Sequence, residues 1–165
     1  VLADHGEQFG IHSLYGHGNS LFRQLLHVPM ILKIPGRAPG QVASPVTIAD
    51  LHDTLLEAVG VQRREGTELA LFDPARRRPA VAEYLNGPTG SETFCAANQR
   101  YHLIVGLDNR QTLFDYQSDP AEIHPLSDGD SVLTSDLHTR IEMARRQWVG
   151  TRSTTSMFRS LGYLE

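Results

Sequence analysis

The chain has 165 residues, a length that allows one domain or a part of a larger one. Its composition is that of an ordinary globular protein, 40% hydrophobic and 21% charged with a net charge of −4, and it lacks the clustered basic face that nucleic-acid binding requires. No apolar run approaches the roughly 20 residues of a membrane-spanning helix, and the single cysteine, Cys95, excludes an internal disulfide.

The first residues place a carboxylate and an imidazole side by side. Val1 and Leu2 are expected to end a buried strand, which would put Asp4 and His5 at the edge of a sheet where α/β proteins bind ligands. The two side chains can converge on one divalent cation only if the backbone turns sharply, and Gly6 supplies that freedom. The alternative is a polar loop in which the pair is coincidental.

Two helices and one strand are expected in the rest of the first 61 residues. Residues 20–27 predict a short helix, and residues 30–34 form a nearly continuous apolar run, typical of a strand buried on both faces. Thr47 and Asp50 have the spacing of a capping box, and Gly60 ends the helix that follows. One face of that helix is expected to be apolar, through Ile48, Leu51, Leu55 and Val59.

The second half of the chain predicts an antiparallel sheet and a long helix. Short strands are expected over residues 79–85, 92–98, 101–105 and 112–116. The turns over residues 98–100 and 107–110 are short enough for antiparallel pairing. A helix over residues 131–148 carries a core-facing stripe of Leu133, Leu137, Ile141, Ala144 and Trp148.

Several segments resemble, in their order along the chain, the sulfatases of the alkaline-phosphatase superfamily. They are Asp4–Gly10, Leu14–Phe22, Leu26–Ile31, Pro45–Leu51, Thr112–Glu122 and Phe158–Leu164. The resemblance implies an α/β fold, namely the C-terminal portion of an alkaline-phosphatase-like α/β sandwich plus a small antiparallel four-stranded sheet with a packed C-terminal helix. Residues 1–61 would form the end of the core with its metal loop, 62–78 a linker, 79–150 the antiparallel subdomain and 151–165 a tail.

The resemblance also implies a function. The intact enzyme would hydrolyse sulfate esters of small molecules or glycans, using a divalent metal ion and a formylglycine nucleophile. Asp4 and His5 correspond to two metal ligands, with Ca²⁺ favoured and Mg²⁺, Mn²⁺ or Zn²⁺ as alternatives. Alternative functions are a phosphoryl hydrolase or phosphoethanolamine transferase of the same superfamily, or a non-catalytic remnant.

His17 and Glu7 are the other candidate site residues. His17 stands where many sulfatases have a lysine, and the only lysine of this chain, Lys33, lies in the apolar run. As a catalytic residue, His17 could donate a proton to the leaving group or bind the sulfate. Glu7 is interpreted either as a carboxylate that hydrogen-bonds into the loop and orients the site, or as an exposed side chain.

The nucleophile of the family is missing. The sequence contains no Cys/Ser-x-Pro-x-Arg motif, and Cys95 is followed by Ala96 and Ala97, so we expect it to be a small buried apolar residue. The aspartates that hold the metal from the N-terminal side are missing as well. The chain alone is therefore expected to be inactive, and to associate with itself or with the missing N-terminal part. The sequence leaves the compartment open.

Overall fold

The computed structural model describes residues 1–61, 71–72, 78–86, 91–106, 108–127 and 131–151. Most of the predicted linker and nearly all of the predicted tail lie outside these residues, so the proposed domain boundaries stay predictions. Among the described residues, no helix is both long and apolar enough to cross a bilayer. The elements in chain order are β1 (Gln8–Phe9), the 3-10 helix η1 (Ile11–Ser13), β2 (Tyr15–Gly16), α1 (Arg23–Leu26), α2 (Asp50–Ala58), β3 (Ala80–Asn86), β4 (Ser91–Ala97), β5 (Tyr101–Val105), β6 (Gln111–Asp115) and α3 (Ser131–Thr151).

The four later strands form one antiparallel sheet in the order β3-β4-β5-β6, as the sequence predicted. Their ends lie within one residue of the expected ones. The β4–β5 turn is held by Asn98, whose Oδ1 accepts the amide protons of Arg100 at 3.0 Å and of Tyr101 at 2.8 Å. The short turn fixes the register, in which Ala96 lies opposite Leu103.

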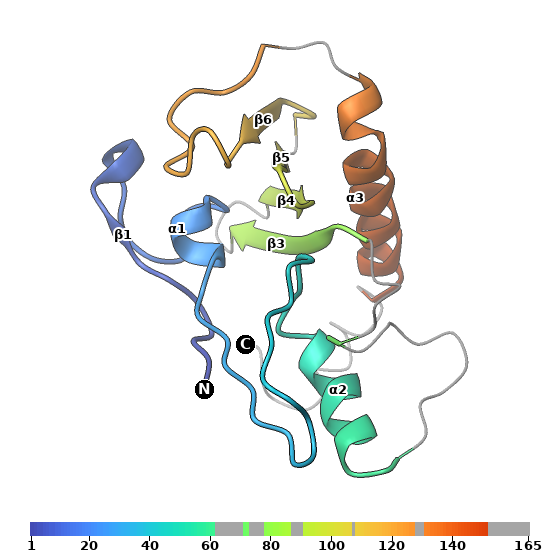
Figure 1. Ribbon diagram of the computed structural model, residues 1–165. Coiled ribbons are helices and arrows are strands. Elements are labelled where there is room, and N and C mark those ends of the chain that lie inside the picture. Colours follow the sequence, from blue (N-terminus) through green and yellow to red (C-terminus); the bar gives the residue numbers. More distant parts are fainter. Residues whose placement is uncertain (62–70, 73–77, 87–90, 107, 128–130, 152–165) are drawn as a thin grey trace, which may run out of the picture.

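Helix α3 covers one face of this sheet and forms the hydrophobic core with it (Figure 1). Alternate strand residues point toward the helix, and their burial from water is the main stabilising contribution. The buried cluster consists of Phe94, Ala96, Leu103, Val105, Leu137 and Ile141. The predicted helix stripe is thus confirmed at Leu137 and Ile141 and at the partly buried Ala144, whereas the side chains of Leu133 and Trp148 are outside the described ones.

The N-terminal segments cover the opposite face of the sheet (Figure 1). The Phe22 ring lies edge-on to the Phe114 ring of β6, with centroids 6.0 Å apart. Leu21 and Leu25 are buried here, although α1 is only four residues long, shorter than the helix predicted over residues 20–27. Cys95 is also buried, as expected. This packing joins the predicted metal loop to the C-terminal sheet.

The prediction of a strand over residues 30–34 is wrong. Met30 forms only an isolated antiparallel bridge with Leu2, and Ile31 is largely exposed. Val1 and Leu2 are likewise exposed rather than buried. A strand that is buried on both faces needs neighbours on each side, and the described residues supply only this one bridge.

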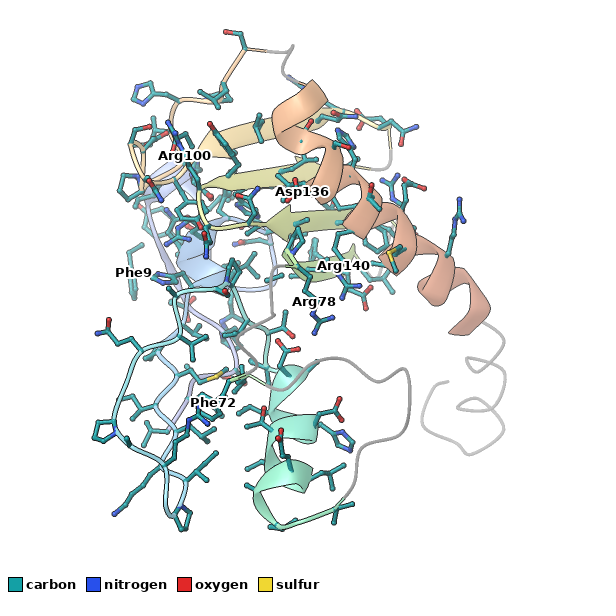
Figure 2. All side chains as sticks on the ribbon, turned by 45° about the vertical axis from the view of Figure 1, so that its right-hand side comes forward. Phe9, Phe72, Arg78, Arg100, Asp136 and Arg140 are labelled. Carbon is teal, nitrogen blue, oxygen red and sulfur yellow. The ribbon has the colours of Figure 1, made fainter. Side chains whose placement is uncertain are left out.

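The prediction of an apolar face on α2 is also wrong in part. Leu51 is buried, but Ile48, Leu55 and Val59 are exposed. The buried face instead carries Asp50 and Thr54. Hydrogen bonds to Asp50 stabilise this face. The Thr47 amide donates to Asp50 Oδ2 at 2.6 Å, and the Arg78 guanidinium donates to Asp50 Oδ1 at 2.5 Å. Arg78 lies between the sheet and α2 (Figure 2).

Candidate functional site

A two-stranded hairpin builds the loop that carries the predicted site residues. Strands β1 and β2 pair so that Phe9 lies opposite Tyr15 and Gln8 opposite Gly16. The hairpin returns the chain toward its start and brings the residues after β2 beside those before β1. Sequence reasoning missed this hairpin because two-residue strands leave no readable alternation. Phe9 is exposed and points away from the body of the protein (Figure 2).

Gly6 is required for a different reason from the one expected. Its φ is not in the left-handed region. Its amide donates to the carbonyl oxygen of Leu25 at 2.8 Å. A Cβ at this position would lie 1.9 Å from the carbonyl oxygen of Gln24. Gly6 therefore permits the close approach of α1 to the backbone beside the Asp4–His5 pair, rather than a sharp turn.

The Asp4 and His5 side chains face each other at the surface. Asp4 Oδ1 accepts the amide proton of His5 at 3.0 Å. The His5 ring donates from Nδ1 to the Gly6 carbonyl oxygen at 2.8 Å, since a carbonyl can only accept. The neutral ring therefore carries its lone pair on Nε2, which lies 4.0 Å from Asp4 Oδ2.

This donor pair fits a divalent cation. Ligand distances of about 2.0–2.6 Å allow both atoms to reach one ion placed between them. A hydrogen bond from the second ring nitrogen to a carbonyl is also typical of histidines that bind metals. The same hydrogen bond, with smaller contributions from Asp4 and Glu7, raises the pKa of His5. The part of the chain that the structure describes has no group of three or more metal-binding side chains, so a closed site needs further donors.

His17 and Glu7 lie against this pair. Glu7 Oε2 accepts from His17 Nδ1 at 3.2 Å. The His17 ring lies over the His5 ring, with centroids 4.4 Å apart and a tilt of 31°. The structure thus brings the four predicted side chains together on one exposed surface. Their roles in binding and catalysis stay predictions.

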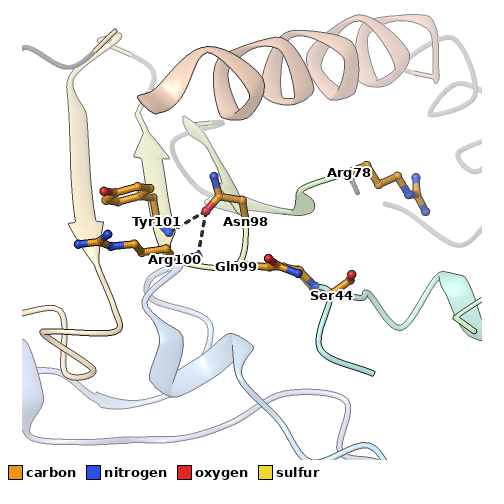
Figure 3. Close-up of a pocket in the computed structure, with 7 residues that line it drawn as sticks. Ser44, Arg78, Asn98, Gln99, Arg100 and Tyr101 are labelled. Carbon is orange, nitrogen blue, oxygen red and sulfur yellow. Dashed lines mark hydrogen bonds between the residues drawn. The ribbon is translucent and has the colours of Figure 1, made fainter. Parts of the chain in front are cut away.

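A pocket of about 250 Å³ lies beside the β4–β5 turn, next to Ser44 and Pro45 (Figure 3). It contains two arginines, a pattern that could bind an anion. The Arg78 guanidinium donates to Asp50, however, and the Arg100 guanidinium to Asp115 at 2.8 and 3.0 Å. Figure 3 shows the two guanidinium groups pointing away from each other. The pocket therefore does not present converging positive charges to a ligand.

Three curated proteins with similar sequences are named as sulfatases. No family model matches the chain. The uncharacterized sulfatase YidJ of Escherichia coli K12 is 26% identical over 137 residues, which cover 76% of this chain and 27% of that protein. The choline-sulfatase of Rhizobium meliloti 1021 is 25% identical over 134 residues, with coverages of 76% and 26%. Arylsulfatase K of Xenopus laevis is 24% identical over 140 residues, with coverages of 73% and 26%.

Solved structures share the fold at low sequence identity. A 2-O GAG sulfatase superposes with a TM-score of 0.68 at 20% identity, over 99% of this chain and 37% of that one. BT4656, solved with its substrate D-glucosamine-2-N,6-O-disulfate, superposes with a TM-score of 0.68 at 17% identity, over 90% of this chain and 34% of that one. The chain thus spans about a quarter of the length of the curated relatives it matches.

Proposed function

Because the chain is homologous to the C-terminal part of sulfatases, we propose that the intact protein hydrolyses sulfate esters and that Asp4, His5 and His17 belong to its active site. The homology rests on the relatives described above. The observation that carries the residue assignment is the convergence of Asp4, His5 and His17 on one surface. The family implies a divalent metal ion and a formylglycine nucleophile, and the nucleophile would come from a part of the protein outside this chain.

Asp4 and His5 would hold the metal ion through Oδ2 and Nε2. A bound divalent cation offsets the negative charge of the ester and positions the attacking oxygen. The Asp4 carboxylate is a hard oxygen donor, which favours Ca²⁺, while the imidazole of His5 also suits Mn²⁺ or Zn²⁺. The Gly6 carbonyl keeps the His5 ring in the tautomer that offers Nε2.

His17 would contact the ester itself. The hydrogen bond to Glu7 uses Nδ1, so Nε2 is the nitrogen that can meet an ester oxygen. In its protonated form, in which both ring nitrogens carry hydrogen, the ring could bind the sulfate through that atom or donate its Nε2 proton to the leaving group. Glu7 would act through His17 by fixing the direction of its ring.

The substrate would be a sulfated small molecule or glycan. The relative named choline-sulfatase supports the first class. The fold neighbours, a 2-O GAG sulfatase and a protein solved with a disulfated glucosamine, support the second. The names of the curated relatives favour sulfate over phosphate esters.

The exposed apolar residues support a pairing partner for this chain. Val1, Ile31 and Val59 are each more than half exposed, on segments that the sheet and α3 leave uncovered. We propose that these residues pack against the remaining part of the protein, and that the isolated chain associates with itself through them. Sedimentation of the isolated chain should show association at high concentration, and Val59→Lys should weaken it. A strict monomer, or association that Val59→Lys leaves unchanged, would contradict this proposal.

Hydrolysis of an aryl sulfate and of the matching aryl phosphate by the complete protein tests the function. We expect preference for the sulfate, and a loss of at least about 100-fold in kcat/KM for Asp4→Ala and His5→Ala. His52→Ala, an exposed histidine of α2, is the matched control and should keep full activity. The 165-residue chain alone should show no turnover. Preference for the phosphate, or full activity of Asp4→Ala, would overturn the proposal.

A further inference from the structure

The Glu122 carboxylate is fully buried and accepts hydrogen bonds on both oxygens. Oε1 accepts from His102 Nδ1 at 2.6 Å, and Oε2 accepts from the backbone amide of Arg23 at 2.9 Å. Glu122 also adopts a φ of 58°, in the left-handed region that is unfavourable for a residue with a Cβ. A strained backbone and a buried carboxylate persist only when surrounding interactions offset their cost, and these two hydrogen bonds contribute to that.

The partner of this carboxylate is a buried histidine. His102 is buried on β5, and burial alone would lower its pKa. Interactions with Cys95 and Glu122 outweigh that effect and raise the pKa to about 9. The 2.6 Å hydrogen bond between the two side chains fixes the Glu122 carboxylate in one position relative to the sheet.

Glu122 holds the start of α1, and α1 holds the backbone next to the Asp4–His5 pair. Arg23 is the first residue of α1, so its amide has no partner within the helix and donates to Glu122 instead. Two residues later, the Leu25 carbonyl accepts the amide proton of Gly6 at 2.8 Å. Gly6 also supplies the carbonyl that orients the His5 ring. A continuous series of contacts thus runs from the sheet to the predicted metal ligands.

The residue before Glu122 contacts the same loop. The Ala121 carbonyl oxygen accepts from Gln24 Nε2 of α1 and from His12 Nε2 of η1, each at 3.1 Å. The His12 ring stacks on Phe22, with centroids 3.7 Å apart. The turn at residues 121–122 therefore anchors both α1 and the hairpin loop on the C-terminal sheet.

We propose that Glu122 is a positioning residue for the Asp4–His5 pair, which it acts on through the Arg23 amide, α1 and the Leu25–Gly6 hydrogen bond. Its consequence for catalysis rests on the function proposed above, but its consequence for the geometry of the loop does not. When Glu122 loses its hold on α1, the Leu25 carbonyl and the Gly6 backbone move apart. The direction of the His5 ring is then no longer defined.

Amide hydrogen exchange of the 165-residue chain tests this with two variants of one residue. Arg23→Pro removes the N–H that Glu122 accepts, at the first helical position, where proline is tolerated. Arg23→Ala removes the same guanidinium and keeps the N–H. We expect exchange of the Gly6 amide to be about tenfold faster in Arg23→Pro than in Arg23→Ala, with the amides of β4 and β5 equal in the two variants. Equal Gly6 exchange in the two variants would overturn the proposal.

A second comparison changes the carboxylate itself. Glu122→Gln can accept one of the two hydrogen bonds but not both. Asp115→Asn is the matched control, because Asp115 is a buried carboxylate of β6 whose partners, the Arg100 guanidinium and the Gln117 amide, do not belong to α1. Gly6 exchange, relative to that of Leu103 in the core, should rise about tenfold in Glu122→Gln and stay unchanged in Asp115→Asn. An equal relative change in both variants would show a general loss of stability and overturn the proposal.

The complete protein separates this proposal from the proposed function. In Arg23→Pro the kcat for an aryl sulfate should fall about tenfold relative to Arg23→Ala. Faster Gly6 exchange without any sulfatase activity in the unmodified protein would overturn the function and keep the positioning role. If the unmodified protein is an active sulfatase but Gly6 exchange is equal in Arg23→Pro and Arg23→Ala, the function stands and the positioning role is overturned.

Discussion

The imidazole rings of His5 and His17 lie 4.4 Å apart, centroid to centroid, although residues 6–16 separate them in the chain. The β1–β2 hairpin produces this contact, and Glu7 fixes the second ring through a 3.2 Å hydrogen bond. The carboxylate of Asp4 lies 4.0 Å from His5 Nε2. The pair proposed to bind the metal and the candidate proton donor therefore share one surface.

Replacement of His17 should reduce turnover more than replacement of Glu7. We expect His17→Ala to lower the kcat of the complete protein on an aryl sulfate by about 100-fold or more, because it would remove the group that we propose contacts the ester. Glu7→Gln should cost about tenfold, because it only loosens the ring of His17. Steady-state kinetics measures both, and a larger effect of Glu7→Gln than of His17→Ala would reverse the assigned roles.

Alanine at position 6 should destabilise the fold. Its Cβ would lie 1.9 Å from the Gln24 carbonyl oxygen, so the backbone of α1 or of the loop must move. We expect a loss of about 2 kcal/mol or more in the free energy of unfolding of the 165-residue chain, measured in urea. Gly40→Ala is the control, because nothing lies within 4 Å of a Cβ there. Similar midpoints for the two variants would contradict the close approach.

Stability should decrease above neutral pH because of His102. Its pKa is about 9 in the folded chain, against 6.5 for an unperturbed histidine. The folded state therefore binds the proton more tightly, and the stabilisation is fully present below pH 6.5 and lost as the pH rises through about 9. The loss should approach roughly 3 kcal/mol. Urea unfolding of the 165-residue chain between these pH values measures it.

His102→Gln is the control for this pH dependence. His27 acts in the opposite sense, because burial, with a smaller contribution from Arg23, lowers its pKa. The effect of His27 on stability remains in His102→Gln. The difference between the stability–pH curves of the unmodified chain and of His102→Gln therefore reports the contribution of His102. A decrease in stability that persists unchanged in His102→Gln would assign the effect to another group.

The C-terminal sheet and its helix could be predicted because their signals are local. Strand alternation, the turn at Asn98 and the stripe through Leu137 and Ile141 each follow from neighbouring residues in the chain. Asp4, His5 and His17 could also be named as candidate site residues, because they lie close together in the sequence. These parts of the structure depend little on contacts between distant segments.

The features that the sequence did not predict depend on such distant contacts. The strand expected at residues 30–34 needed neighbours that the described residues do not supply beyond Leu2. The role of Gly6 follows from the approach of α1, which no pattern around Gly6 reveals. The hydrogen bond between His102 and Glu122 joins residues 20 positions apart, and nothing in the sequence marks the two as partners.

Metal content of the complete protein tests the central claim, that Asp4 and His5 hold the ion used in sulfate-ester hydrolysis. Elemental analysis after dialysis should find a bound divalent ion in the unmodified protein and in His52→Ala. Asp4→Ala should lose that ion together with activity on an aryl sulfate, and His5→Ala should do the same. Retention of the full metal content by Asp4→Ala and His5→Ala would contradict the account.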